Sequence, residues 1–271
     1  MNPSLFVQPT PEERCWNWHR YLVRVIHGAW ARDLVNQVPL PTAARVIDIA
    51  CATGTVAREA AQKAGPGGES IGFDLDAMML RVAAQIPAAP DSAPLRWIQG
   101  DVMAMPFAPG TFDAVFCQQG LQFFPDRAEA LRRLRHILKP GGWIALSVLR
   151  PTEHNPGAQV FGDALGRQFG PEARKRFRMT FEVGEAPELH HLLASAGFID
   201  TSVVPSPRTA VWSSPEEFVA ASMNGCTTVN VALEPSKIEA IISDVRQGLA
   251  QFFKEGRLEL PMSCYLVTAR T

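Results

Sequence analysis

Short apolar runs rich in Val, Ile and Phe alternate, along the first 150 residues, with segments whose apolar residues recur at steps of three and four. Runs of the first kind are typical of buried strands, and the spacing of the second kind is typical of amphipathic helices. We therefore expect five strands that alternate with helices. The expected strands are 45–50, 70–74, 95–99, 111–117 and 143–149, and the expected helices are 12–37, 55–64, 76–86 and 127–138.

The alternation weakens after residue 150. Apolar periodicity predicts further helices, and two more apolar runs predict strands. Proline lacks the N–H group that the interior of a sheet requires, so Pro205 and Pro207 are expected to end the sixth strand. The expected helices are 157–178, 187–196, 215–223 and 235–253, and the expected strands are 198–204 and 263–269.

This order of elements predicts the α/β class, with a doubly wound, mostly parallel, seven-stranded sheet that carries helices on both faces. We expect a single domain over residues 1–271. Its core sheet is expected to come from 42–150, 187–204 and 262–271. The rest is expected to form a mostly helical lid, from 1–40, 151–186 and 205–261.

Composition excludes several classes of function. The formal net charge of −1 lacks the basic excess expected of a nucleic-acid or membrane-surface binder. No apolar run approaches the ~20 residues that cross a bilayer, and the N-terminal residues lack the pattern of a secretion signal. The five cysteines are scattered, without a Cys-x-x-Cys pair, which indicates reduced thiols rather than disulfides or a zinc site. We therefore expect a cytoplasmic protein without a bound metal.

Three carboxylates follow the first three expected strands. Asp48 lies near the end of the first strand, Asp74 ends the second, and Asp101 follows the third. Right-handed crossovers place the carboxyl ends of parallel strands along one edge of a sheet. After Asp48, the small residues of 50–54 lead directly into a helix, which would aim its N-terminal N–H groups at a ligand. The sequence therefore predicts a ligand crevice at this edge.

Four blocks in this region resemble the motifs of class I S-adenosylmethionine-dependent methyltransferases. They are VIDIACATG (46–54), GFDLDAMML (72–80), GDVMAMPF (100–107) with GTFDAV (110–115), and LKPGG (138–142). Together they span roughly 45–149, in the order and at the spacing of that family. They are most similar to the small-molecule branch typified by the C-methyltransferases of ubiquinone and menaquinone biosynthesis. The resemblance implies a Rossmann-like methyltransferase fold and S-adenosyl-L-methionine as the cofactor.

The resemblance also implies a role for each motif residue. The methionine end of the cofactor would be held by Asp48 and by the loop residues Ala50, Cys51, Ala52 and Gly54. Asp74 would accept hydrogen bonds from both ribose hydroxyls, and Asp101 would accept from the adenine amino group. Leu75, Met79 and Val102 would pack beside the adenine. Cys117 and Gln118, at the end of the fourth strand, would meet the methionine amino group and the transferring methyl group.

The chain departs from this family at Ala52, where glycine is usual. The extra methyl group could crowd the cofactor, or be harmless if the backbone angles suit alanine. A non-catalytic S-adenosylmethionine-binding protein is therefore one alternative. A nicotinamide-dependent oxidoreductase is another, although the chain lacks a full Gly-x-Gly-x-x-Gly motif.

The expected reaction is an in-line displacement, in which positioning alone can supply much of the acceleration, so no residue has to act as a catalyst. If the acceptor must lose a proton, His154 is the best candidate for the general base, because it follows the fifth expected strand. The aromatic residues of the expected lid favour a small, apolar or aromatic methyl acceptor. The sequence leaves open which molecule and which atom are methylated, and the oligomeric state.

Overall fold

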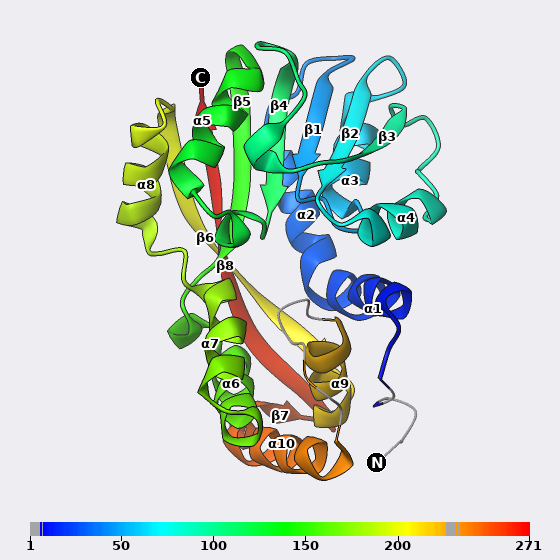
Figure 1. The fold of residues 1–271 in the computed structure, drawn as a ribbon, viewed down its shortest axis with the longest axis vertical. Helices are drawn as coiled ribbons and strands as arrows, with labels where there is room; N and C mark the ends of the chain where they lie inside the picture. Colours follow the sequence, from blue (N-terminus) through cyan, green and yellow to red (C-terminus); the bar gives the residue numbers. More distant parts are fainter. Residues whose placement is uncertain (1–5, 7, 226–230, 232–233) are drawn as a thin grey trace. The chain divides into compact units, whose positions relative to one another are not determined.

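The computed structural model describes residues 6, 8–225, 231 and 234–271 (Figure 1). Cys226 and parts of the expected lid lie outside these residues. Within the described ranges, no helix is both long and apolar enough to span a bilayer.

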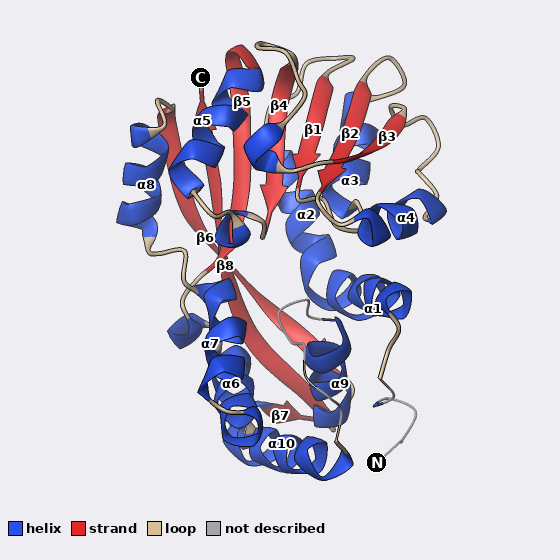
Figure 2. Cartoon of the chain, viewed as in Figure 1, coloured by secondary structure: helices blue, strands red, loops and turns tan. Residues whose placement is uncertain are grey.

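The strands form one sheet in the order β3-β2-β1-β4-β5-β8-β6 (Figure 2). Its first five strands along the chain are β1 (Arg45–Ile49), β2 (Glu69–Asp74), β3 (Leu95–Gln99), β4 (Phe112–Gln118) and β5 (Leu138–Leu149). Each neighbouring pair among these five is parallel. The chain order reverses between β1 and β4, the kind of switch point at which open α/β sheets bind ligands. The expected fold class is confirmed, and a short additional strand, β7 (Phe253–Lys254), pairs antiparallel with β8 (Arg257–Arg270).

The helices follow the expected alternation. In chain order they are α1 (Pro11–Asn17), α2 (Gly28–Asn36), α3 (Thr55–Ala64), α4 (Ala77–Gln85), α5 (Arg127–Ile137), α6 (Pro156–Phe169), α7 (Pro171–Arg178), α8 (Ala186–Ser195), α9 (Pro215–Gly225) and α10 (Pro235–Gly248). A π-helical segment, Trp18–His27, connects α1 to α2. Thr10 and Glu13 form a reciprocal capping box at the start of α1, which explains why the helix begins at Pro11.

The chain divides into two compact units, and we describe each by itself. The sheet unit comprises 27–148, 183–205 and 265–271, and the aromatic unit comprises 1–26, 149–182 and 206–264. Strands β6 (Ile199–Trp212) and β8 contribute residues to both units. Residues 27–40, expected in the lid, belong to the sheet unit. The description of the chain as a single domain stays a prediction.

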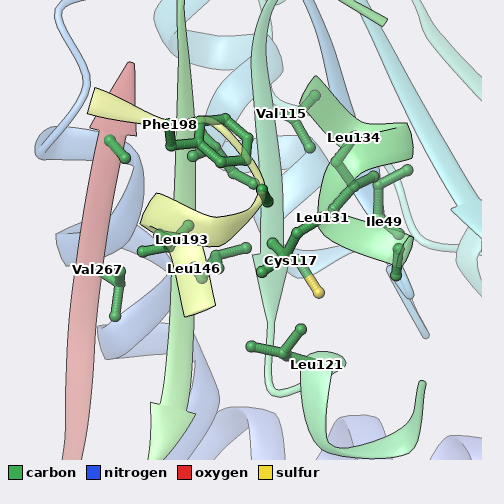
Figure 3. Close-up of a cluster of buried hydrophobic side chains, with 14 of the residues drawn as sticks. Ile49, Val115, Cys117, Leu121, Leu131, Leu134, Leu146, Leu193, Phe198 and Val267 are labelled. Carbon is green, nitrogen blue, oxygen red and sulfur yellow. The ribbon is translucent and has the colours of Figure 1, made fainter. Parts of the chain in front are cut away.

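Apolar side chains from the strands and from the covering helices build the core of the sheet unit (Figure 3). The labelled residues come from β1, β4, β5 and β8, from α5 and α8, and from the loops beside them: Ile49, Val115, Cys117, Leu121, Leu131, Leu134, Leu146, Leu193, Phe198 and Val267. Each fully buried Leu or Ile stabilises the fold by about 1.5–3 kcal/mol relative to exposure. This core sets the carboxyl ends of β1 and β4 beside each other.

A run of contacting aromatic rings fills the core of the aromatic unit. Phe161 packs edge-on against Phe177 at a centroid distance of 5.1 Å and against Phe218 at 6.0 Å. Phe177 also contacts Phe181, and Phe218 contacts Trp212, both at 5.7 Å. All five side chains are buried, so these rings are core residues rather than an exposed lining.

Two predictions about strand ends were wrong. Strand β6 continues through Pro205 and Pro207 to Trp212. Among the described strands, β6 is the last in the sheet order, so one side of its backbone has no neighbour there. A proline on that side costs no ladder hydrogen bond. Residues 139–142, which separate the expected helix 127–138 from the expected strand 143–149, instead belong to the start of β5. There Gly141 has a φ of 74°, and the pairing with β4 shifts register.

Candidate functional site

The loop between β1 and α3 has an unusual backbone. Ala50, Ala52 and Gly54 have positive φ angles of 54°, 47° and 75°. Glycine adopts this conformation freely, whereas it costs other L-residues ~1–2 kcal/mol. The two alanines are therefore strained, and backbone strain of this kind clusters at ligand sites.

Asp48 anchors the helix that follows this loop. Its side chain is 2% exposed, and Oδ2 accepts the backbone N–H of Ala57, in the first turn of α3, at 3.0 Å. Among the described residues, Oδ1 has no hydrogen-bond partner. Burial raises the pKa of Asp48 well above its ordinary value, and the charge of Asp74 raises it further. A cationic group at Oδ1 would oppose that shift, so Asp48 suits the amino end of a bound methionine.

Asp74, the last residue of β2, joins the loop after β1 to the start of α4. Its Oδ2 accepts the N–H of Ala52 at 2.7 Å, and its Oδ1 accepts the N–H of Asp76 at 2.8 Å. The N-cap of α4 is Asp76, so Asp74 does not serve as the helix cap. Burial raises the pKa of Asp74. Each carboxylate oxygen keeps acceptor capacity that the two hydroxyls of a ribose can use.

The residues assigned to the adenine differ in exposure. Leu75 is 67% exposed directly beside Asp74, whereas Met79 and Val102 are buried. Asp101 is exposed, and its Oδ1 accepts the N–H of Met103 at the start of the short helix Val102–Ala104. Leu75 therefore offers apolar surface to a flat ring, and the adenine contacts of the other three residues stay predictions.

Three further assigned residues lie on or beside the neighbouring strands β1 and β4. Cys51 and Cys117 are buried, and burial raises the pKa of both thiols and so favours their protonated form. Gln118 is half-buried, and its Nε2 donates to the carbonyl oxygen of His27 at 3.0 Å. Their contacts with the cofactor stay predictions.

Arg58 of α3, which no motif in the sequence indicated, binds the backbone of the loop between β1 and α3. Its Nη1 donates to the carbonyl oxygens of Thr53 at 2.6 Å and Gly54 at 2.8 Å. Its Nη2 donates to the carbonyl oxygens of Ala83 at 2.5 Å and Ile86 at 3.3 Å, at the end of α4. Burial lowers the pKa of Arg58 to about 10, so the guanidinium keeps its charge at neutral pH. Arg58 thus connects the loop with the helix that follows Asp74.

Trp97 of β3 completes this arrangement. The guanidinium carbon of Arg58 lies 5.1 Å from the centroid of the indole ring, within cation–π range. A Cβ atom built on Gly54 or Gly72 would come within 2.4 Å of ring atoms of Trp97. The indole therefore occupies the space that side chains at these two glycines would need. The glycines themselves were a signal of close approach, but nothing in their spacing pointed to Trp97.

These features fit a nucleoside cofactor that carries a cationic methionine end. Asp48 and Asp74 supply negative charge, Asp74 supplies acceptors for a diol, and Leu75 supplies exposed apolar surface. Gly54, the N-cap of α3, has no side chain to cover the N–H groups of the helix, which can therefore face a carboxylate. In the described ranges, no three His, Cys, Asp or Glu side chains are arranged to hold a metal ion.

His154 belongs to the aromatic unit rather than to the sheet unit that carries the loop. It ends the short helix Thr152–His154, it is exposed, and its Nε2 lies 2.8 Å from Nη2 of Arg150. That contact requires an unprotonated Nε2, because a guanidinium can only donate. The assignment of His154 as a general base stays a prediction.

Ala52→Gly is expected to raise the free energy of unfolding, measured by urea denaturation, by about 0.5–1 kcal/mol. Glycine removes the ~1–2 kcal/mol cost of the positive φ at Ala52 in the folded state. Its greater conformational freedom also stabilises the unfolded chain by ~0.5–1 kcal/mol, which offsets part of this gain. The matched control is Ala43→Gly, because Ala43 has a φ of 58° and precedes β1, away from the loop. Both variants should gain stability alike, but only Ala52→Gly should tighten S-adenosylhomocysteine binding if the methyl group crowds the cofactor. A loss of stability in Ala52→Gly would contradict the strain argument.

Comparison with known proteins places this geometry in a family. Residues 46–142 match the family model described as a methyltransferase domain. The chain is 36% identical over 122 residues to the 2-phytyl-1,4-naphtoquinone methyltransferase of Thermosynechococcus vestitus, a match that covers 45% of this chain and 53% of the relative. It is 31% identical over 192 residues to the demethylmenaquinone methyltransferase of Staphylococcus aureus, covering 65% and 77%. The chain thus spans about half the length of the first of these relatives.

Solved structures share the fold at low identity. The YcgJ protein of Bacillus subtilis has a TM-score of 0.61 at 17% identity, over 90% of this chain and 98% of that chain. Phosphoethanolamine N-methyltransferase 2 of Haemonchus contortus, solved with S-adenosyl-L-methionine, has a TM-score of 0.60 at 17% identity, over 95% and 57%. A 31% identical relative is matched over 77% of its length. The sheet order, together with the loop and its carboxylates, points to the same family. The chain belongs to the family of S-adenosylmethionine-dependent methyltransferases.

Proposed function

We propose that this protein transfers a methyl group from S-adenosyl-L-methionine to a small molecule with an oxygen-bearing aromatic ring. The hydrogen bond from the Ala52 N–H to Asp74 carries the cofactor half of this proposal. It joins the small-residue loop to the ribose-binding carboxylate, so one ligand can contact both. The exposed Leu75 beside Asp74 supports the same orientation, with the adenine over apolar surface.

The residues of the site bind and orient the reactants. Asp48 and the N-terminus of α3 hold the methionine end, and Asp74 holds the ribose. When bound, S-adenosyl-L-methionine supplies an electrophilic methyl group and leaves as S-adenosylhomocysteine. The negative charge of Asp48 and Asp74 favours the cationic form of this ligand over the neutral product. Orientation of the reactants can supply about 7–11 kcal/mol of the acceleration.

The acceptor class is supported by the names of two relatives. The proteins of T. vestitus and S. aureus are named as methyltransferases of a phytyl-naphthoquinone and of demethylmenaquinone. Both names denote quinones, which are rings that carry oxygen and become aromatic when they are reduced to hydroquinones. The non-catalytic alternative rests on Ala52 alone, which adopts a left-handed backbone conformation at a cost of ~1–2 kcal/mol but still donates its N–H to Asp74.

Methyl transfer from labelled S-adenosyl-L-methionine to 2-prenyl-1,4-naphthohydroquinone, kept reduced under anaerobic conditions, tests this function. We expect a methylated ring product and an equal amount of S-adenosylhomocysteine. Indole and histamine, which carry no oxygen, serve as comparison acceptors of another class. Tight S-adenosylhomocysteine binding without transfer to any ring would support the non-catalytic alternative. Transfer to the amines alone would overturn the acceptor class but not the cofactor.

His154→Ala is expected to lower turnover of the same probe by roughly 10²–10⁴-fold, if a neutral imidazole accepts the proton of a ring hydroxyl as the methyl group arrives. Affinity for S-adenosylhomocysteine should stay unchanged, because the loss lies in the transition state. The control is His191→Ala, since His191 is exposed on α8. Turnover within a few-fold of the parent would remove His154 from the reaction.

A further inference from the structure

The turn after β4 carries two buried glutamines with unused hydrogen-bonding capacity. Gln119 and Gln122 are 6% and 3% exposed. Within the part of the chain that the structure describes, Oε1 of Gln119 and both amide atoms of Gln122 have no hydrogen-bond partner. Buried amides are almost always paired, because an unpaired buried polar group destabilises the folded state. Two such groups in one turn therefore have the capacity to bind a polar ligand.

Gln119 is held in a strained and well-defined conformation. Its φ is 55°, a region that non-glycine residues seldom occupy. Its backbone N–H donates to the carbonyl oxygen of Ser147 at 2.9 Å, and its Nε2 donates to Oγ of the same serine at 3.2 Å. Ser147 lies on β5 and is fully buried. Both bonds orient the amide of Gln119 and leave its Oε1 as an acceptor.

The turn after β4 lies directly against the loop between β1 and α3. A Cβ atom built on Gly120 would stand 2.7 Å from the Cβ atom of Ala50 and 2.6 Å from Sγ of Cys117. Only glycine allows this approach. The charges of Asp48 and Asp74 both act on Cys117, so the end of β4 is close to the two carboxylates. The turn that carries the two glutamines therefore lies at the switch point between β1 and β4, where ligands of open α/β sheets bind.

We propose that Gln119 and Gln122 bind a neutral hydroxyl group of the methyl acceptor and so select oxygen-bearing rings. This inference rests on the proposed function, whose acceptor class it explains. A hydroxyl can donate to either Oε1 and accept from Nε2 of Gln122. An ionised carboxylate or phosphate cannot donate to Oε1, and a hydrocarbon can do neither. His27, whose carbonyl accepts from Gln118, adds no charge, because burial lowers its pKa to about 4.

Such a site selects by exclusion as well as by attraction. An acceptor without the hydroxyl would leave the buried amides unpaired inside the complex. Sites built to bind a substrate hydroxyl reject the analogue that lacks it far more strongly than apolar pockets discriminate between hydrocarbons. The expected signature is therefore a preference between two ligands that differ only in their oxygen atoms.

Calorimetry on the complex with S-adenosylhomocysteine measures this preference. The two probes are 2-prenyl-1,4-naphthohydroquinone, under anaerobic conditions, and 2-prenylnaphthalene, which lacks both oxygens. We expect the wild-type complex to bind the hydroquinone at least about tenfold more tightly than the hydrocarbon. Gln122→Leu should abolish most of this preference while S-adenosylhomocysteine affinity stays within about twofold. Gln122→Met, of similar length and without the amide, is the second variant if the leucine variant does not fold.

Two further variants complete the design. Gln119→Asn shortens the amide while asparagine still tolerates the left-handed backbone, so it should reduce the same preference. Gln62→Leu is the control, because Gln62 is exposed on α3 and should leave every affinity unchanged.

Each contrary result overturns the proposal in a distinct way. Loss of S-adenosylhomocysteine affinity in Gln122→Leu, with the preference intact, would assign the amides to the cofactor. An unchanged preference in both Gln122 variants would show that the amides serve only the fold. A wild-type complex that does not prefer the hydroquinone would overturn the inference, while its binding of S-adenosylhomocysteine would still uphold the cofactor half of the proposed function.

Discussion

Asp74→Asn is expected to weaken S-adenosylhomocysteine binding by about 1.5–3 kcal/mol, roughly a 10–150-fold rise in Kd. In the proposed site, the substitution removes the charge that would strengthen the hydrogen bonds from both ribose hydroxyls. Asparagine keeps one carbonyl oxygen, which can still accept the N–H of Ala52, so the loop retains its link to β2. Isothermal calorimetry measures the change in affinity, and thermal unfolding measures any separate loss of stability.

The matched control for this prediction is Asp126→Asn. Asp126 caps α5 by accepting the N–H of Glu129 at 2.9 Å, and asparagine is an equally good N-cap. It belongs to the same sheet unit, and its carboxylate caps α5 and has no part in the proposed ribose contacts, so its replacement should leave the Kd unchanged. An unaltered Kd in folded Asp74→Asn would remove Asp74 from the ribose site.

Arg58→Met is expected to lower the free energy of unfolding by about 2–4 kcal/mol and to weaken S-adenosylhomocysteine binding by roughly tenfold or more. The change leaves the carbonyl oxygens of Thr53, Gly54 and Ala83 without their charged donor, and buried unpaired acceptors are costly. The loop also loses the contact that links it to α4. For Arg58→Lys we expect a stability and an affinity between those of the wild type and of Arg58→Met, since an ammonium cannot reproduce the planar fork of a guanidinium. Urea denaturation and calorimetry measure the two effects.

A double-mutant cycle with Ala52→Gly separates two roles of Arg58. If Arg58 stabilises the left-handed conformation of the loop, that contribution matters less once glycine, which adopts this conformation without strain, is at position 52. Ala52→Gly should then restore some of the affinity lost in Arg58→Lys. If Arg58 only caps the end of α4, the two changes in binding free energy should add within about 0.5 kcal/mol. An additive result would therefore confine Arg58 to the helix end.

The elements of the fold were largely predictable because their signals are local. Thr10, Pro11 and Glu13 mark a helix start within four residues, and Asp76 and Asp126 are side chains that cap the helices directly following them. The main failure, at Pro205 and Pro207, arose because tolerance of proline depends on whether a strand has a neighbour on both sides. That is a property of the sheet, not of the segment.

The carboxylates of the site were predictable for a different reason. In a parallel α/β sheet the connections themselves bring the strand ends together, so Asp48, Asp74 and Asp101 could be placed from their positions after strands. The bond between Asp74 and the Ala52 N–H agrees with that placement. Arg58, Trp97 and Gln122 could not be found this way. Arg58 and Trp97 matter through their contacts with residues on other elements, and Gln122 matters because its buried amide has no partner among the described residues.

The sequence by itself determined the strand–helix order, the helix caps, the small-residue loop and the carboxylates at the strand ends, since each depends on a few neighbouring residues or on connection rules. Only the tertiary structure decided that the guanidinium of Arg58 spans the loop and the end of α4, that the ring of Trp97 fills the space beside Gly54 and Gly72, and that the amide of Gln122 is buried without a partner. Side chains of this length reach several neighbouring elements, and which one they meet depends on how the helices and strands pack.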